Sequence, residues 1–294
     1  MRDKGRMGGG WTIGIIGGSG LYAVDGIEDG QWIEVATPWG APSDALFTGR
    51  VGHVSVVFLP RHGRGHRIAP GEINARANID ALKRLGVTDI LAVSSVGSLA
   101  EARPPGSFTI ADQFIDRTRG RPPSFFGTGM VAHVSLADPV CPRLSRLAGD
   151  AAEAAGAQVH RGGTYLAMEG PQFSTRAESN LYRQWGCDVI GMTAMPEARL
   201  AREAQLPYAL VGMVTDYDCW REGEDAVDVA QVIAQLGANA AKARAMVVNL
   251  LRSLPRTREP SPIDSCLNSA LITAPSSRDP ELLATLDAVM GHRR

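Results

Sequence analysis

Residues 208–220 read YALVGMVTDYDCW, and this stretch indicates the class of fold. Residues 208–215 are apolar almost throughout, which is typical of a strand that is buried on both faces. Such strands belong to sheets that are covered by helices on each side. Two carboxylates, Asp216 and Asp218, follow the run with one tyrosine between them. Acids at the end of a buried strand indicate a polar ligand at that end of the sheet.

The strand pattern recurs along the chain. Apolar and β-branched runs occupy residues 12–16, 54–60, 89–95, 107–112, 188–193 and 208–215. Between and after them, helical patterns occupy residues 73–85, 144–155, 175–185, 196–204 and 227–254. The pair Thr175 and Glu178 predicts a capping box at the start of one helix. Alternating strands and helices predict an α/β fold with a largely buried sheet.

The domain organisation follows from the one stretch rich in proline, arginine and serine, SLPRTREPSP, which begins at residue 253. We expect residues 11–254 to form one domain and residues 1–10 to be a disordered extension. We expect residues 255–294 to form a linker and a C-terminal helix, with Asp279 as its N-cap. That helix should pack on the same domain or on a neighbouring subunit.

Composition excludes several classes of partner. The chain has 294 residues, 44% of them hydrophobic, with 30 basic and 31 acidic residues and a net charge of −1. There is no block of like charge, so neither nucleic acid nor an anionic membrane is an expected partner. No apolar run approaches the length of a membrane span, and the N-terminal region lacks a signal-peptide core. We therefore expect a cytoplasmic protein that acts on a small molecule.

Metal and disulfide chemistry find no support in the sequence. The four cysteines, Cys141, Cys187, Cys219 and Cys266, lack CxxC spacing, and the six histidines lack an HExxH pattern. Neither a zinc site nor a disulfide framework is indicated, and no GxSxG elbow for a serine nucleophile is present. We expect no metal and no organic cofactor.

A glycine-rich turn follows the first predicted strand in IGIIGGSGLY, residues 13–22. Its backbone N–H groups and Ser19 could cradle an anion such as phosphate. The spacing of Gly14, Gly17, Gly18 and Gly20 differs from the GxGxxG pattern of nicotinamide-binding Rossmann proteins, which leaves that class as a weak alternative.

Other strand ends carry groups that suit the same anion. Arg61 and His62 follow the run at residues 54–60, and an arginine fork matches phosphate oxygens. Ser94, Ser95 and Thr193 stand at the ends of two further runs. Because open α/β sheets bind ligands at strand ends, we expect these side chains to converge in one crevice.

Several motifs together carry a resemblance to a known family. They are GIIGGSGLY, RHGxxHxxxPxxINxxANxxAL, IDRT, EGPxFSxRAE, MTxxPEAxLAxE and TDYDCW, in that order along the chain. Over residues 12–252 the sequence resembles the 5′-methylthioadenosine phosphorylases of the trimeric purine nucleoside phosphorylase family. The resemblance implies a mixed β-sheet, distorted toward a barrel and flanked by helices. It also implies a pentosyltransferase of purine and methionine salvage, with inorganic phosphate as co-substrate.

The resemblance also implies roles for individual residues. It places Phe173 against the purine, the Met192 backbone near the ribose 2′-hydroxyl, and Asp216 and Asp218 on the purine N7 and exocyclic amine. His133 would reach the active site of a neighbouring subunit, in a homotrimer or a dimer of trimers. The residues implied to hold phosphate are Ser19, Arg61, His62, Ser94, Ser95 and Thr193.

The chemistry explains the two acids. Cleaving the glycosidic bond builds negative charge on the purine, so a proton shared with N7 lowers the barrier. Two acids in a half-buried site raise each other's proton affinity, and we take Asp216 as the protonated partner. Phosphorylases of the family that take 6-oxopurines carry asparagine at the Asp216 position and an acid where Ser174 stands. Adenine is therefore the expected base, with methylthioinosine or ordinary purine nucleosides as the alternative, and a hydrolytic nucleosidase less favoured.

Overall fold

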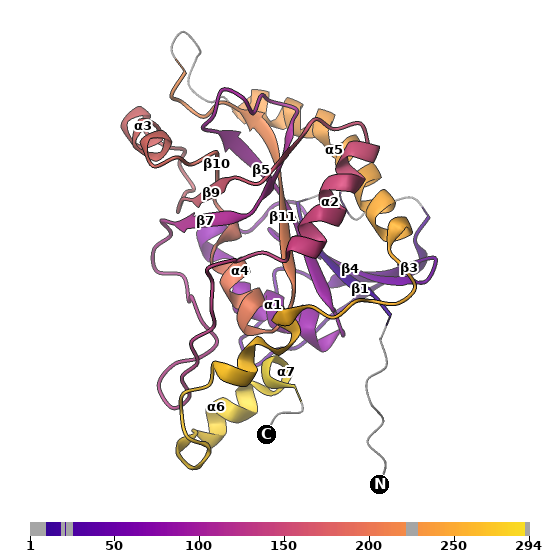
Figure 1. The fold of residues 1–294 in the computed structure, drawn as a ribbon, viewed down its shortest axis with the longest axis vertical. Coiled ribbons are helices and arrows are strands. Elements are labelled where there is room, and N and C mark those ends of the chain that lie inside the picture. The colour runs from indigo at the N-terminus through magenta and orange to yellow at the C-terminus, as the bar shows by residue number, and fades with distance from the viewer. Residues whose placement is uncertain (1–9, 19–20, 22–25, 222–228, 292–294) are drawn as a thin grey trace.

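A single mixed sheet dominates the computed structural model, which describes residues 10–18, 21, 26–221 and 229–291 (Figure 1). Nearly all of the expected N-terminal extension therefore lies outside the described residues. The strands are β1 (Thr12–Gly17), β2 (Glu28–Ile33), β3 (Leu46–Val51), β4 (Val54–Pro60), β5 (Asp89–Ser98), β6 (Phe108–Ala111), β7 (Gln113–Asp116), β8 (Val159–Arg161), β9 (Thr164–Ala167), β10 (Val189–Gly191) and β11 (Tyr208–Asp216).

Part of the sheet closes on itself. Strand β5 pairs with β1 and β11 in parallel, and its last residues pair with β10 in the antiparallel sense. From β11 the ladder continues to β6, and only Asp112 separates β6 from β7. Strand β7 then pairs with β9, and β9 with β10, which leads back to β5. This ring is the distorted barrel within a mixed sheet, so the expected fold class is confirmed.

Helices cover the sheet on two sides (Figure 1). They are α1 (Ala75–Arg84), α2 (Pro142–Ala154), α3 (Arg176–Gln184), α4 (Ala194–Glu203), α5 (Val229–Ser253), α6 (Pro280–Thr285) and α7 (Asp287–Met290), with 3₁₀ turns η1 (Pro70–Glu72), η2 (Pro262–Ser269) and η3 (Pro275–Ser277). Successive strand residues alternate between two cores, as the pleat requires. Ile15 and Val211 pack with residues of α2 and α5, whereas Ile16 and Leu210 pack with residues of α1 and α4.

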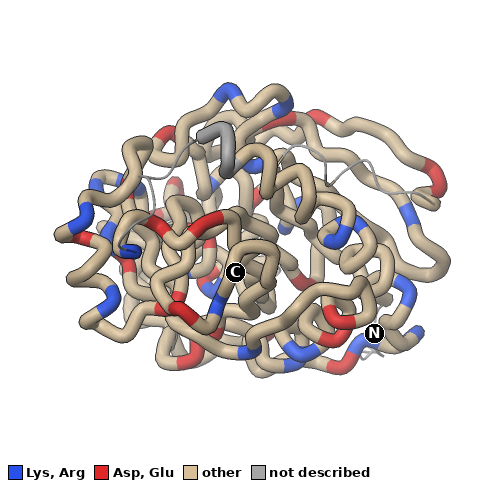
Figure 2. Tube along the Cα trace, turned by 90° about the horizontal axis from the view of Figure 1, so that it is seen from above, with Lys and Arg blue, Asp and Glu red and all other residues tan. Residues whose placement is uncertain are grey.

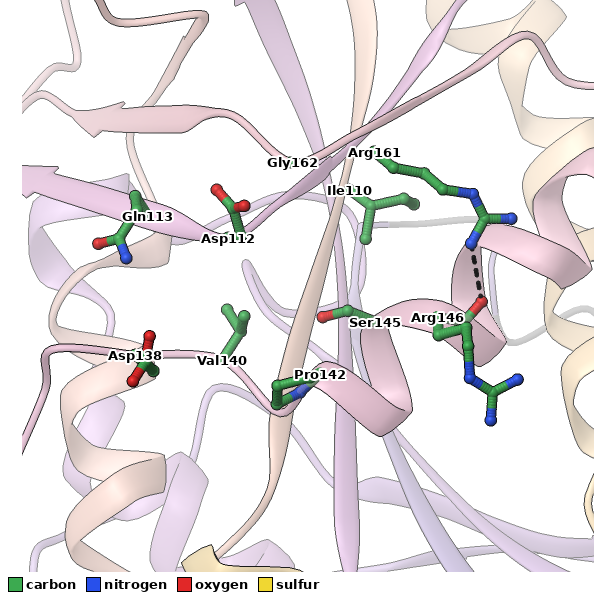
Figure 3. Close-up of a pocket in the computed structure, with 10 residues that line it drawn as sticks. All are labelled: Ile110, Asp112, Gln113, Asp138, Val140, Pro142, Ser145, Arg146, Arg161 and Gly162. Carbon is green, nitrogen blue, oxygen red and sulfur yellow. Dashed lines mark hydrogen bonds between the residues drawn. The ribbon is translucent and has the colours of Figure 1, made fainter.

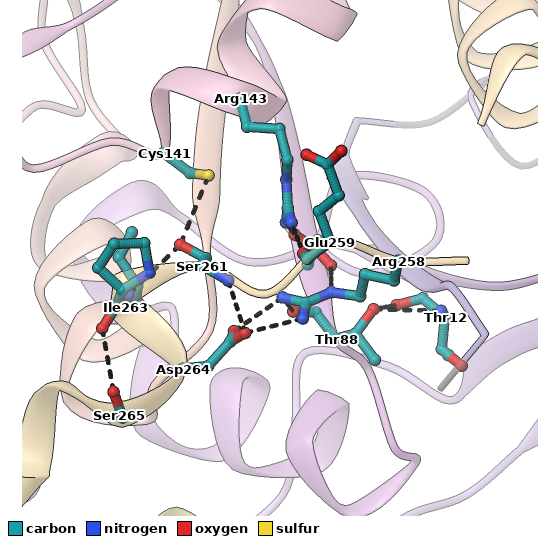
Figure 4. Close-up of polar contacts among 12 residues, drawn as sticks. Thr12, Thr88, Cys141, Arg143, Arg258, Glu259, Ser261, Ile263, Asp264 and Ser265 are labelled. Carbon is teal, nitrogen blue, oxygen red and sulfur yellow. Dashed lines mark hydrogen bonds and ion pairs between the residues drawn. The ribbon is translucent and has the colours of Figure 1, made fainter. Parts of the chain in front are cut away.

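The C-terminal segment packs on the same body as the sheet. Leu286 and Val289 belong to the core cluster that contains α1 and α4 residues. Before them, the Arg258 guanidinium pairs with Asp89 at the start of β5 and with Asp264 of η2, in the network drawn in Figure 4. The expected N-cap is present, because the Asp279 carboxylate accepts from two backbone N–H groups of α6.

The sequence predicted some of these elements and not others. The capping box of α3 is present, with Thr175 and Glu178 bonded to each other's backbone N–H groups. The apolar runs did not predict five of the eleven strands that the structure describes, namely β2, β3, β7, β8 and β9. Strand β2 is polar and exposed along most of its length, and β8 has only three residues.

Figure 2 shows basic and acidic residues interspersed along the chain trace. In the part of the chain that the structure describes, no helix combines the length and hydropathy needed to cross a membrane.

Candidate active site

Arg61 directly follows β4, lies beside the end of β1 and the middle of β5, and is almost completely buried, with 2% of its surface exposed. Its guanidinium donates to both carboxylate oxygens of Glu197 from α4, at 2.9 and 3.1 Å. It also donates to the carbonyls of Val93 and Ile16, at 2.9 and 3.4 Å. Tyr208 completes the cluster by donating its hydroxyl to Glu197. The arginine is thus held rigidly at the strand ends.

These bonds limit what Arg61 can offer a ligand. They use four of its five N–H groups, so one remains for an anion. Burial favours the neutral form, yet Glu197 holds the pKa of Arg61 above its ordinary value. Arg61 is therefore always positively charged, and its charge interacts with Glu197 and with any anion that binds beside it.

His62 follows Arg61 and has a defined tautomer. Its Nδ1 lies 2.9 Å from the Ile68 carbonyl, which can only accept, so Nδ1 carries the proton. Its ring stacks on His66 at 4.1 Å. Burial, with smaller effects from Arg61 and His66, lowers the pKa of His62 to about 4. At neutral pH the ring therefore presents Nε2 as an acceptor.

Two of the strand-end hydroxyls meet. The Oγ atoms of Ser94 on β5 and Thr193 before α4 lie 3.2 Å apart, although the two residues are 99 positions apart in the sequence. Ser95 is the next residue on β5, and its carbonyl accepts from the Ser94 hydroxyl. Because Ser94 follows Val93, whose carbonyl binds Arg61, these hydroxyls lie close to the arginine. Ser19 lies outside the described residues.

Asp216 and Asp218 lie at the end of β11, where its pairing with β5 shifts register. The Asp216 carboxylate accepts from the Thr215 hydroxyl at 2.6 Å and from the Asp218 backbone N–H at 2.8 Å. Burial raises the pKa of Asp216, although both bonds oppose the change. Burial also raises the pKa of Asp218, and the nearby Asp216 adds to the effect. Proton uptake by this pair is thus easier than for exposed acids.

The backbone around the two acids is unusual. Asp218 has φ of +53°, a left-handed conformation that non-glycine residues adopt mainly under constraint. Gly97 on β5 gives the acids room, because a Cβ there would meet the Asp216 Oδ1 at 3.0 Å. The next residue, Cys219, contacts the Ser174 carbonyl through its sulfur at 3.2 Å. The loop that carries Phe173 and Ser174 is thereby brought beside the acids.

Phe173 and Met192 lie on two loops that touch. The Phe173 ring is 44% exposed, which leaves a flat face open to a ligand. Met192 packs against Gly170 in the same loop as Phe173, where a Cβ would lie 2.4 Å from the Met192 sulfur. Gly170 also has φ of +70°, so both space and conformation require glycine.

His133 lies on a segment that pairs with the C-terminal residues, next to the Ala132–Leu271 bridge. Its side chain is exposed, and its backbone N–H donates to Ala270 in the C-terminal segment. Its role toward a neighbouring subunit therefore stays a prediction.

The candidate groups line up along β5. The hydroxyls of Ser94 and Thr193 stand beside Arg61, and Gly97 stands beside the acids. Three residues of extended chain span about 10 Å. An anion beside Ser94 and a flat ring beside Gly97 would thus be separated by a distance that a sugar can bridge.

One cavity of the described residues lies away from these groups. A cavity of about 420 Å³ opens between Ile110, Pro142 and Arg161 (Figure 3). Two of its charged groups have partners: Arg161 donates to the Arg146 carbonyl, and Asp112 accepts from a backbone N–H. No predicted site residue lines this cavity. The described residues also contain no group of three or more metal-ligating side chains.

The comparison with known families decides the assignment. The model of the Phosphorylase superfamily matches residues 12–252. The chain belongs to the phosphorylase superfamily. This membership replaces the nicotinamide-binding alternative that the glycine-rich turn left open.

Relatives within the superfamily are close. The chain is 60% identical to S-methyl-5′-thioadenosine phosphorylase of Cereibacter sphaeroides over 281 residues, which cover 95% of this chain and 97% of that protein. It is 56% identical to the protein of the same name in Bradyrhizobium diazoefficiens, with the same coverage.

Solved structures of superfamily members agree. A methylthioadenosine phosphorylase from an Antarctic soil metagenomic library has a TM-score of 0.91 at 44% identity, covering 95% of this chain and 99% of that one. The Schistosoma mansoni methylthioadenosine phosphorylase in complex with adenine has a TM-score of 0.78 at 35% identity, covering 95% and 97%.

Two residues of the site escaped the sequence-based prediction. Glu197 neutralises Arg61 from 136 positions away, and Arg121 binds the Met192 carbonyl. Each occurs within or beside a motif that carries the family resemblance, but nothing in the residue types identifies its partner. Only the packing of α4 and of the loop after β7 brings them to the site.

Proposed function

We propose that this chain cleaves 5′-methylthioadenosine with phosphate, giving adenine and 5-methylthioribose 1-phosphate. It is then a pentosyltransferase of purine and methionine salvage. The observation that carries the proposal is the pair of half-buried acids beside Gly97 of β5, with the Arg61, Ser94 and Thr193 cluster three residues earlier along the same strand. The similarity to S-methyl-5′-thioadenosine phosphorylases over nearly the whole chain supports it.

In this proposal, phosphate binds beside Arg61. The remaining N–H of Arg61 and the hydroxyls of Ser94 and Thr193 donate to its oxygens, with Ser19 and Ser95 completing the cradle. Neutral His62 offers Nε2 as an acceptor, which suits the P–OH of a hydrogen phosphate ion. A phosphate oxygen then attacks C1′ of the ribose, and its negative charge stabilises the developing cation.

On the other side, the acids assist departure of the purine. Asp216 carries a proton and shares it with N7, while Asp218 accepts from the exocyclic amine of adenine. The raised pKa of both acids favours a protonated partner in the pair. Phe173 stacks on the ring, and the Met192 backbone binds the ribose 2′-hydroxyl.

Adenine suits this arrangement better than hypoxanthine. Ser174 stands where an acid would have to accept from the N1–H of a 6-oxopurine, and two carboxylates face the amine side. The Schistosoma mansoni relative is solved with adenine bound. The second candidate, a phosphorylase that prefers methylthioinosine or ordinary purine nucleosides, requires the acids to face other atoms.

Assembly forms part of the proposal. His133 is exposed on a segment that the C-terminal residues hold in place, so it is available to another copy. A homotrimer, or a dimer of trimers, would bring His133 to the ribose of a neighbouring site. We place this enzyme in the cytoplasm, where the four cysteines stay reduced.

The test uses purified protein with 5′-methylthioadenosine and with 5′-methylthioinosine, each with and without phosphate. Separation of the released bases and sugars should show phosphate-dependent adenine release that far exceeds hypoxanthine release. Base release without phosphate would mean a hydrolase. Preference for the inosine analogue would mean that the acids have been assigned to the wrong atoms.

A further inference from the structure

One guanidinium outside the candidate set binds both loops of the nucleoside site. Arg121 lies in the segment after β7, and its side chain is 6% exposed. Its Nη1 donates to the carbonyls of Met192 and Met195, at 2.6 and 3.0 Å. Its Nη2 donates to the Glu169 carbonyl at 2.7 Å, and its Nε to the Glu169 carboxylate at 3.1 Å. Four N–H groups are thereby used on two segments.

These two segments carry different parts of the proposed site. Glu169 and Gly170 begin the loop that leads to Phe173, where the purine would stack. Met192 belongs to the turn that leads to Thr193, beside the phosphate cluster. The loops are in direct contact, since Gly170 leaves no room for a Cβ against the Met192 sulfur. Arg121 therefore fixes the distance between the base end and the phosphate end.

The segment that supplies Arg121 is itself anchored. The Arg119 backbone N–H donates to the second oxygen of Glu169 at 2.6 Å. Beyond Arg121, the Ser124 hydroxyl and the Phe125 backbone N–H donate to the Glu203 carboxylate of α4, both at 2.7 Å. A side chain fixed at both ends of its own segment can act as a rigid brace.

We propose that Arg121 is a positioning residue that holds the base-stacking loop in register with the ribose and phosphate turn. It touches neither substrate and acts through Met192 and Glu169. The inference rests on the proposed phosphorolysis, because that reaction requires base, ribose and phosphate to be aligned at once. A misplacement of about 1 Å between reacting groups can cost about 100-fold in rate.

Arg258 offers a matched control. Its guanidinium also makes four bonds, to Asp89, Asp264 and the Thr88 carbonyl, and it is similarly shielded, with 11% exposure. Thr88 and Asp89 lie at the start of β5 and Asp264 lies on η2, whereas the acids of the proposed site lie beside Gly97 near the other end of β5. Arg258→Met should therefore lower stability without changing the alignment of the site.

The experiment compares wild type, Arg121→Met, Arg121→Lys and Arg258→Met at a temperature where thermal melts show each to be folded. Initial rates are measured over a grid of 5′-methylthioadenosine and phosphate concentrations, and adenine binding is measured by calorimetry. We expect Arg121→Met to lose about 100-fold in kcat/KM for both substrates and to bind adenine more weakly. Arg121→Lys should recover part of the loss, and Arg258→Met should keep its constants within about threefold.

Two outcomes would overturn the inference. Arg121→Met could keep wild-type constants, or it could change only in proportion to its folded fraction. Equal kinetic losses in Arg258→Met would likewise assign the effect to general stability. If Arg121→Met does not fold, Glu169→Gln weakens the same contact with Arg121, and its kinetic constants and adenine affinity test the same inference. Wild-type protein that lacks phosphorolysis would end the proposed function, whereas adenine binding would still decide the role of Arg121.

Discussion

The two ends of β5 use buried charge in different ways. At its start, Asp89 is fully buried and pairs with Arg143 and Arg258, and Arg258 also pairs with Asp264 (Figure 4). At its other end, Asp216 and Asp218 lie close together, and neither has an ion-pair partner within the described residues. The acid at the start of β5 is therefore neutralised by arginines, whereas the two acids near its other end have no cation partner among the described residues.

The difference distinguishes buried acids that stabilise the fold from acids that can bind a ligand. Buried carboxylates with arginine partners hold segments together but have little left to offer a ligand. Burial raises the pKa of Asp89 as well as those of Asp216 and Asp218, so the difference lies in the partners. Half-buried carboxylates without cations keep acceptor positions for a ligand, which is a property of functional groups. Arg61 falls between these cases, because Glu197 takes two of its N–H groups, backbone carbonyls take two more, and one remains.

The largest effect is expected from replacing an aspartate by asparagine at the end of β5 that lacks cations. Asp216→Asn removes the proposed proton donor to N7, so kcat/KM for 5′-methylthioadenosine should fall about 10²- to 10⁴-fold. Steady-state kinetics on 5′-methylthioadenosine and 5′-methylthioinosine measure the effect. An increase in adenosine-type activity would contradict the assignment and favour the alternative substrates.

At the start of β5, where arginines neutralise the acid, Asp89→Asn is the matched change. It leaves Arg143 and Arg258 without their shared carboxylate, and the cost should be about 3–5 kcal/mol of unfolding free energy. Urea denaturation measures the loss, while kcat/KM of the folded protein should stay within about twofold. A catalytic defect with unchanged stability would refute the division between the two ends.

His62 sharpens the comparison through pH. Its folded-state pKa of about 4 lies below the ordinary value of 6.5, so the folded protein binds fewer protons between these values. The contribution to stability is complete above about pH 6.5 and is lost as the pH falls toward 4, by at most about 3 kcal/mol. Urea midpoints between these pH values should show the slope in wild type. In His62→Asn, which keeps a donor for Ile68, an equally steep slope would exclude His62 as its source.

The smallest effect should come from one hydroxyl of the phosphate cluster. Ser94→Ala removes one hydrogen bond to the phosphate anion, which is worth about 1.5–3 kcal/mol, so KM for phosphate should rise about 10- to 150-fold. The KM for the nucleoside should change little. A selective loss of nucleoside affinity would place Ser94 in the wrong half of the site.

Much of the fold could be predicted from residue patterns. Buried strands such as β4 and β11 stand out because both of their faces are apolar, and α3 because its capping box is local. Strand β2 could not be found in this way, since its pairing with β3, not its own composition, defines it. The family resemblance implied a sheet distorted toward a barrel, but no residue pattern predicted that the ring closes through Asp112.

Some residues of the candidate site could likewise be predicted from the sequence, and others could not. Arg61, Ser94 and Thr193 could be nominated because strand ends follow from local patterns, and strand ends converge in α/β sheets. Their partners could not, because Glu197 and Arg121 reach the site only through tertiary packing. His133 is exposed in the single chain, so only the family resemblance supports its role.

Closure of the ring also has a consequence for folding. The ring joins β5, β9 and β11, which lie far apart along the chain, and such distant pairings form slowly. The two halves of the proposed site meet only when β10 and β11 have both joined β5. Catalytic activity regained during refolding should therefore appear later than helical structure, and it would report the moment at which the ring is complete.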